Sequence, residues 1–126
     1  MRQKSQSSIK TGELSSSEQS RSFVDGSHRS VVQLRSAVIG LGTYLPGWRW
    51  SLHAGVQNES PSENHVGYVI SGYMTIRDSH GNEQKIGPGE AFEAGPGHDA
   101  WVVGNVPCIA LDFAPILKRV TSTTKR

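Results

Sequence analysis

The sequence has little of what marks a membrane protein or a disulfide-stabilised one. Its 126 residues include one cysteine, Cys108, so no intrachain disulfide can form, and we expect a reducing compartment, the cytoplasm. No stretch of about 18 apolar residues occurs, and no apolar segment follows the charged N-terminus. We therefore expect no membrane partner and no secretory signal, and Cys108 is expected to be a small buried apolar residue.

The central part of the chain also lacks a surplus of positive charge. Residues 38–114 carry three Lys/Arg and eight Asp/Glu. Residues 1–37 carry six Lys/Arg and three Asp/Glu, and residues 115–126 carry four Lys/Arg and no Asp/Glu. A domain that binds nucleic acid needs its basic residues on the folded surface. We therefore expect no nucleic-acid partner, and we interpret the basic ends of the chain as solvated tails.

A helical period is missing from the whole stretch between Val38 and Phe113. Twelve of the 14 glycines lie between Gly40 and Gly104, which is typical of tight turns between short strands. Residues 30–45 are expected to hold one or two strands. Further strands are expected at residues 48–54, 65–77, 83–86, 90–94, 100–103 and 107–113. This pattern predicts an all-β domain, a sandwich or a barrel.

The chain is expected to consist of one folded unit between two polar ends. Residues 1–22 are rich in Ser, Gln and Lys and have too little apolar surface to offset the entropy of ordering, so we expect a disordered tail. Residues 23–37 are transitional and hold a candidate edge strand. Residues 38–114 form the predicted barrel, and residues 115–126 form a basic C-terminal tail.

Two glycine-framed segments resemble the two motifs of the cupin superfamily, which lie on neighbouring strands of a small β-barrel. The first motif runs G-x5-H-x-H-x3-4-E-x6-G, and Gly47, followed after five residues by His53, begins it. Gly55 stands where the family has its second histidine. His65, seven positions before Gly72, stands where the family has its glutamate. The segment GVQNESPSEN lies between them as an inserted loop.

The second motif runs G-x5-P-x-G-x2-H-x3-N. Gly89 begins it and Gly97 matches its second glycine. Ala100 stands where the family has its histidine, but His98 precedes it by two residues and would share its strand face. The resemblance covers about residues 38–114.

The resemblance implies an all-β fold, a small antiparallel and jelly-roll-like barrel with a metal ion or a small molecule inside it. It also implies, for many members, a homodimer. We therefore expect a small-molecule ligand and a homodimeric assembly. The family includes dioxygenases, isomerases, decarboxylases, lyases, storage proteins and ligand-sensing modules, so the fold does not choose among them.

Three histidines are the candidate metal ligands. Strand residues two apart share a face, so His65 and His98 would meet near the barrel axis beside His53 if these faces point inward. Three neutral imidazoles and water suit a divalent metal ion such as Zn, Fe, Ni, Cu or Mn. The alternative is an interior polar residue without an ion or, for His98, a cap on its turn. Glu59 and Glu63 in the inserted loop are candidates for a fourth ligand, or ordinary loop carboxylates.

A further group of residues is expected beside the metal. The candidate pocket residues are Arg49, Ser51, Val69 and Ala100. At a pocket Arg49 would favour a carboxylate on the ligand, although a surface position is the simpler interpretation. Asp99 is a candidate for orienting His98 through a hydrogen bond, or it is a turn residue.

Three functions are compatible with these residues. The first is a metal-dependent enzyme that acts on a small polar metabolite, with the metal as Lewis acid or as activator of O₂ or water. The second is a non-enzymatic module that binds or senses a small molecule, suggested by Gly55 and Ala100 at positions where the family has ligands. The third is a structural dimerisation domain, suggested by the three tryptophans and by exposed sheet faces.

Overall fold

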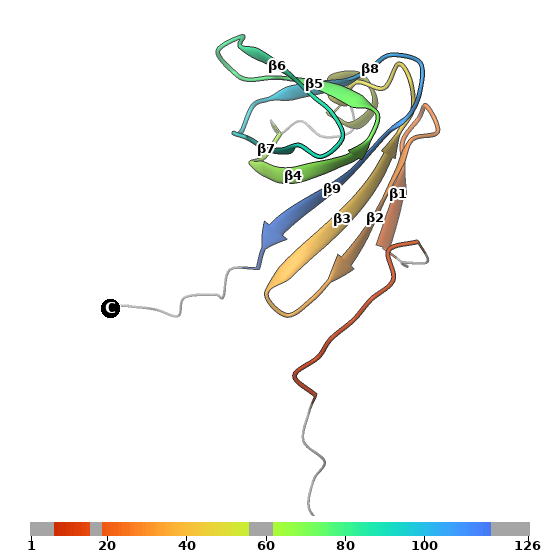
Figure 1. Ribbon diagram of the computed structural model, residues 1–126, viewed down its shortest axis with the longest axis vertical. Helices are drawn as coiled ribbons and strands as arrows, with labels where there is room; N and C mark the ends of the chain where they lie inside the picture. Colours follow the sequence, from red (N-terminus) through yellow and green to blue (C-terminus); the bar gives the residue numbers. More distant parts are fainter. Residues whose placement is uncertain (1–6, 16–18, 56–61, 117–126) are drawn as a thin grey trace, which may run out of the picture.

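The computed structural model describes residues 7–15, 19–55 and 62–116. In this part of the chain, nine strands form two antiparallel sheets, ordered β1-β2-β3-β9-β4-β7 and β6-β5-β8 (Figure 1). The strands are β1 (Gln19–Ser22), β2 (His28–Gln33), β3 (Ala37–Tyr44), β4 (His65–Ser71), β5 (Tyr73–Arg77), β6 (Glu83–Ile86), β7 (Ala91–Ala94), β8 (Asp99–Val103) and β9 (Cys108–Pro115). The predicted all-β fold, a small antiparallel barrel, is confirmed. No helix among the described residues is long and apolar enough to cross a membrane.

The side-chain alternation along β4 decides which residues face the interior. Gly67 and Val69 are buried, whereas Tyr68 and Ile70 are exposed. Because side chains two apart share a face, His65 lies on the inward face with the buried pair. The period of the strand predicted the shared face, and the structure shows that this face points inward.

The N-terminal region differs from the expectation. Residues 19–22 were expected in a disordered tail but form β1, which pairs with β2 in antiparallel register. The expected edge strand within residues 23–37 is instead β2, which lies between β1 and β3. The polar β1 is exposed, but Phe23 directly after it is buried and holds the strand against the core. Of the expected tails, residues 1–6, 16–18 and 117–126 lie outside the described residues.

The expected strand over residues 48–54 is wrong for most of its length. Trp50–Ala54 forms a π-helical turn, η1, whose end is marked by a hydrogen bond from Gly55 N to Trp50 O. Arg49 is extended and makes an isolated bridge with Trp101 of β8. Side-chain hydrogen bonds inside the turn and from β8 hold this conformation. They also fix the position of His53, one of the three predicted metal ligands.

The expected strand over residues 65–77 is divided at Gly72. The residues before it form β4 in the six-stranded sheet, and those after it form β5 in the three-stranded sheet. Gly72 has a φ of 76°, and a register shift occurs between Val69 and Ser71 of β4. The left-handed backbone at Gly72 therefore makes the corner at which the chain changes sheets.

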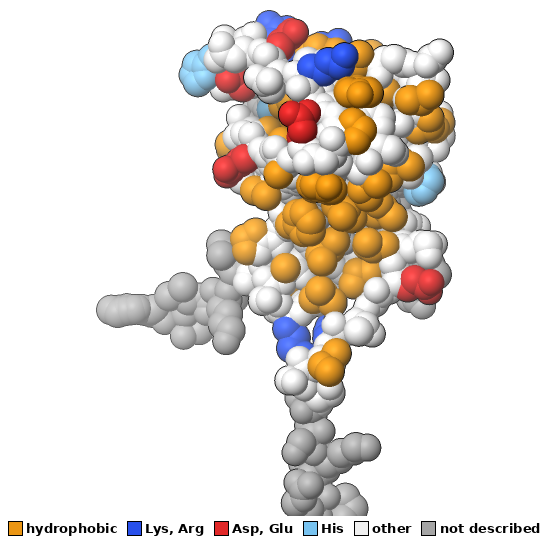
Figure 2. Space-filling model, in the orientation of Figure 1, with side chains coloured by type: hydrophobic (Ala, Val, Ile, Leu, Met, Phe, Trp, Pro, Cys, Tyr) orange, Lys and Arg blue, Asp and Glu red, His pale blue; other side chains and the backbone are white. Residues whose placement is uncertain are grey.

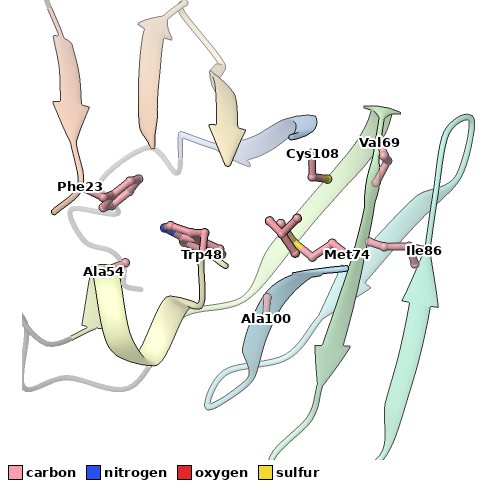
Figure 3. Close-up of a cluster of buried hydrophobic side chains, with 9 residues drawn as sticks. Phe23, Trp48, Ala54, Val69, Met74, Ile86, Ala100 and Cys108 are labelled. Carbon is pink, nitrogen blue, oxygen red and sulfur yellow. The ribbon is translucent and has the colours of Figure 1, made fainter. Parts of the chain in front are cut away.

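The hydrophobic core lies between the two sheets (Figure 3). Val69 and Cys108 contribute from the six-stranded sheet, and Met74 and Ile86 contribute from the three-stranded sheet. Cys108 is fully buried, and burial raises its pKa to about 11. The residue is therefore an uncharged thiol at neutral pH and acts in packing, as the sequence predicted.

Candidate functional site

A cavity of about 240 Å³ lies next to the core, between the two sheets. Its apolar wall is formed by Phe23, Trp48, Trp50, Met74, Ile76 and Phe92, together with smaller side chains. Its polar lining is formed by Arg21, Arg29, Tyr44, Ser62, Glu63, His65, His98 and Asp112. A concave site with an aromatic wall and few converging polar groups is typical of a small-molecule site.

Two of the three predicted histidines meet in this cavity. His65 is the first residue of β4, and His98 follows the turn that leads into β8. Their ring centroids are 5.3 Å apart and the ring planes meet at 64°. This edge-to-face arrangement brings both imidazoles to the cavity lining, as the sequence predicted for His65 and His98.

The orientation of His98 is fixed by the backbone of its own turn. Its Nδ1 lies 2.7 Å from the carbonyl oxygen of Gly95, which can only accept, so Nδ1 carries the proton. Ser62 supports the same turn, because its hydroxyl donates to the carbonyl oxygen of His98 at 2.6 Å. The ring thus caps its turn, as one interpretation of the sequence held. Its Nε2 is left with a lone pair for another partner.

The electrostatic environment of His65 keeps its ring neutral. Burial lowers its pKa below the ordinary 6.5, and the neighbouring His98 lowers it further, while Asp112 opposes the change. A neutral imidazole has one donor and one acceptor. His65 therefore has one donor and one acceptor at neutral pH.

An ion pair between Arg29 of β2 and Asp112 of β9 lies beside the histidines. Arg29 Nε donates to Asp112 Oδ2 at 2.9 Å, and Arg29 Nη2 donates to Asp112 Oδ1. The bond to Asp112 raises the pKa of Arg29 above its usual value. A Cβ on Gly40 would lie 2.5 Å from Arg29 Nη2, so the glycine makes room for the guanidinium. Burial likewise raises the pKa of Tyr44, so its hydroxyl stays protonated.

The third predicted ligand, His53, is placed differently. It lies on η1 and is not among the residues that line the cavity. Its Nδ1 lies 2.9 Å from the backbone nitrogen and 3.2 Å from the carbonyl oxygen of Arg49, so this ring nitrogen is engaged within its own turn. The expected strand would have pointed His53 inward, and the π-helical turn is the reason that it does not.

The remaining predicted residues are partly at the cavity. Glu63 and Ala100 line it, whereas Val69 is fully buried in the core and not in the lining. Glu59 lies outside the described residues. Arg49 and Ser51 are not part of the cavity lining.

Asp99 does not orient His98 as expected but holds η1. Its carboxylate accepts from Arg49 Nε at 3.0 Å and from the backbone N–H and hydroxyl of Ser51 at 3.0 and 2.8 Å. Burial alone would raise the pKa of Asp99, but these hydrogen bonds outweigh it and the pKa is lowered. Arg49 also lies over the ring of Trp101, 4.2 Å from its centroid. The cluster therefore ties the π-helical turn to β8.

The described residues do not fit the predicted three-histidine metal site. Nowhere in the ranges 7–15, 19–55 and 62–116 do three His, Cys, Asp or Glu side chains come together as a metal would require. Two histidines face each other, and His53 is bound to its own turn. A catalytic metal usually needs three protein ligands.

Sequence reasoning missed the residues that complete the cavity. Arg29 lay in the segment described only as transitional, and its partner is 83 positions away. Asp112 carried a weak signal, because it continues the inward alternation of Cys108 and Ala110 in an otherwise apolar strand. A charged residue on an inward face needs a partner, which is a usable sign of a polar site.

Several solved structures share this arrangement of strands. A sugar phosphate isomerase of the cupin superfamily from Silicibacter pomeroyi matches 81% of this chain and 74% of its own, with a TM-score of 0.59 and 18% identity. This chain has a cupin fold. KdgF from Halomonas sp. matches 79% of this chain and 88% of its own chain, with a TM-score of 0.57 and 18% identity. The polyketide cyclase RemF from Streptomyces resistomycificus matches 85% of this chain and 79% of its own chain, with a TM-score of 0.58 and 17% identity.

No family model and no curated protein matches the sequence. The structural neighbours of this protein include enzymes, the isomerase and the cyclase by name. At these identities the likeness extends to the fold only, so function has to be argued from the cavity.

The stability of this protein should depend on the titration of His65. Its folded pKa lies below 6.5, so between the two values the unfolded chain binds more protons and stability rises with pH. The contribution is complete above about pH 6.5 and is lost as the pH falls toward the folded pKa, at no more than about 1.4 kcal/mol per pKa unit. Urea unfolding measured between pH 7.5 and pH 5 should show that the free energy of unfolding falls more steeply in the wild type than in His65→Gln. Equal slopes in both proteins would contradict the expected shift.

Proposed function

We propose that this cupin binds a small, hydroxylated organic molecule in the cavity between its two sheets. One observation carries the proposal: a cavity of about 240 Å³ is lined both by aromatic rings and by the His65–His98 pair. The volume is below the roughly 300–1,000 Å³ of most ligand pockets, which favours a small ligand. A purely structural domain would have no need of such a space.

The chemistry of the lining favours hydroxyl groups over a charged group. The Arg29 guanidinium is engaged by Asp112 in a two-bonded pair, so it is not the partner of a ligand carboxylate. With Nδ1–H on the Gly95 carbonyl oxygen, His98 Nε2 is available to accept a hydrogen bond from a ligand, and neutral His65 supplies a donor or an acceptor. An alcohol both donates and accepts and therefore suits this pair. Phe92 and Trp50 provide rings against which its carbon face packs.

The experiment compares ligand binding in the wild type with a variant that fills the cavity. Ala100 is buried and lines the space, so Ala100→Met should occupy it without removing a polar group. Sugars, polyols and phenols are tested by thermal shift and titration calorimetry. We expect a ligand that stabilises the wild type, binds about 10-fold or more weakly to His98→Gln, and does not bind to Ala100→Met.

The control is Ala114→Met, which adds the same side chain at an exposed position of β9. It should bind the ligand as the wild type does. Unchanged binding to a folded Ala100→Met protein would contradict the cavity as the site, and unchanged binding to His98→Gln would contradict the role of the histidine pair.

A metal-dependent enzyme is the second candidate. It is favoured by one observation, the Nδ1–H of His98 on a backbone carbonyl, because metal-binding histidines usually donate their other ring N–H in this way. His65 and His98 would be the two described ligands of such a site, and a bound divalent ion would supply Lewis acidity. Elemental analysis of protein purified without chelator, beside His65→Ala, separates the candidates. Near-stoichiometric metal that is lost in the variant would favour the enzyme.

A further inference from the structure

The aromatic rings that line the cavity fall into two groups. Phe23, Tyr44 and Trp48 pack against one another, with ring centroids between 4.5 and 6.3 Å apart. Trp50 and Phe92 also line the cavity, but neither is paired with another aromatic ring within residues 7–15, 19–55 and 62–116. These two rings are therefore available for contact with an aromatic ligand.

Glycines leave room for both available rings. Gly67 of β4 is opposite Phe92 of β7, and a Cβ on this glycine would lie 2.4 Å from Phe92 Cζ. A Cβ on Gly55 would lie 2.5 Å from Trp50 Cζ3. Each ring thus packs closely against backbone, which fixes it at the cavity wall before a ligand binds and lowers the entropic cost of binding.

Most of the polar groups in the lining already have protein partners. Two nitrogens of the Arg29 guanidinium donate to the Asp112 carboxylate. The Ser62 hydroxyl donates to the carbonyl oxygen of His98, and Arg21 Nη2 donates to a backbone carbonyl oxygen at 3.2 Å. A ligand that needs many hydrogen bonds would have to break these contacts.

Few polar groups remain for a ligand in the interior of the cavity. They are His98 Nε2, the neutral ring of His65 and the protonated hydroxyl of Tyr44. Glu63, the other polar residue of the lining, is exposed to solvent. A sugar carries a hydroxyl on most of its carbons, and each one buried without a partner weakens binding by about 5-fold or more. A ligand with one or two hydroxyls matches the groups that are left.

We infer that the ligand of this cavity is a hydroxylated aromatic compound, a phenol in chemical class; this inference rests on the proposed function. The phenol O–H donates to His98 Nε2, and the ring packs against Phe92 and Trp50. A phenol combines a flat apolar ring with a single strong donor, so it uses the available rings and leaves no hydroxyl unpaired. A sugar has the opposite balance of hydroxyls and apolar surface.

The test compares the binding of phenol, cyclohexanol and myo-inositol, which share one ring size, to the full chain by calorimetric titration. We expect phenol to bind about 3- to 10-fold more tightly than cyclohexanol, because only phenol gains aromatic contacts. We expect myo-inositol to bind at least about 100-fold more weakly than phenol, because most of its hydroxyls would be buried without partners. Phe92→Leu and Trp50→Leu should each lower the phenol-to-cyclohexanol affinity ratio, whereas His98→Gln should weaken both ligands and leave the ratio unchanged.

The matched control addresses a second surface on which an aromatic probe can adsorb. Figure 2 shows hydrophobic side chains gathered in the middle of the molecule, over the strands that Figure 1 labels β3, β9 and β4. Phe113 of β9 is 37% exposed and is not in the cavity lining. Phe113→Leu therefore makes the same substitution outside the cavity and should keep the wild-type ratio. Circular dichroism establishes that each variant is folded before its affinities are measured.

The outcomes separate this inference from the proposed function. Binding of myo-inositol more tightly than phenol, lost in Ala100→Met, would overturn the inference and leave the proposed function standing. An affinity ratio that is unchanged in folded Phe92→Leu and Trp50→Leu, or that falls in Phe113→Leu instead, would also overturn it. If neither these probes nor any other hydroxylated compound binds, the inference and the proposed function fail together.

Discussion

Gly72→Ala is expected to unfold the domain or to lower its free energy of unfolding by at least about 3 kcal/mol. Two independent costs combine at this corner. The φ of 76° is unfavourable for any residue with a Cβ, and that Cβ would lie 2.2 Å from Pro107 O and 2.7 Å from Cys108 Cα. Both contacts are with backbone, so no side-chain rotation relieves them. Separating these backbones would disturb β9 as well as the corner.

The matched control is Gly104→Ala in the turn between β8 and β9. Gly104 has a similar φ of 93°, but a Cβ there would meet nothing within 4 Å. The control therefore measures the backbone cost alone, about 1–2 kcal/mol. Urea unfolding monitored by circular dichroism gives both values. Equal losses in the two variants would mean that the close approach of β9 to Gly72 is not important for stability.

The fold of this protein was predictable because its signals are local. Alternating side chains mark the strands, and glycines at left-handed positions such as Gly89 and Gly97 mark the turns. β1 was missed because its residues are polar and exposed. Its order depends on pairing with β2 and on burial of Phe23, and neither is visible in a short window of sequence.

The site was predictable only in part, because its geometry depends on contacts between distant segments. The histidines at positions 65 and 98 lie on strand faces whose period could be counted, and they do meet. His53 was expected to join them, but Asp99, 46 positions later in the sequence, holds η1 through Ser51 and Arg49. Hydrogen bonds between the segment at η1 and Asp99 of β8 override the strand preference of WRWSLHA, and no local pattern reports them.

Trp48→Ala should lower the free energy of unfolding by about 3–5 kcal/mol and should also enlarge the cavity. Trp48 is 4% exposed and contacts two rings, with centroid distances of 4.5 Å to Tyr44 and 5.9 Å to Phe23. In Figure 3 it lies between Phe23 and the buried side chains of the two sheets. Removing it deprives both the core and the cavity wall of their largest side chain there, and the neighbours cannot close the gap.

Trp48→Phe separates ring packing from the indole N–H. Trp48 Nε1 is buried and has no hydrogen-bond partner in the part of the chain that the structure describes. Removing an unsatisfied donor costs no hydrogen bond, so Phe should retain most of the stability, with a loss of less than about 2 kcal/mol from the smaller ring. Urea unfolding of the two variants at pH 7.5 measures the difference. If Trp48→Phe loses as much free energy of unfolding as Trp48→Ala, the indole N–H has a partner in solution. In that case the aromatic cluster is not what makes Trp48 important for stability.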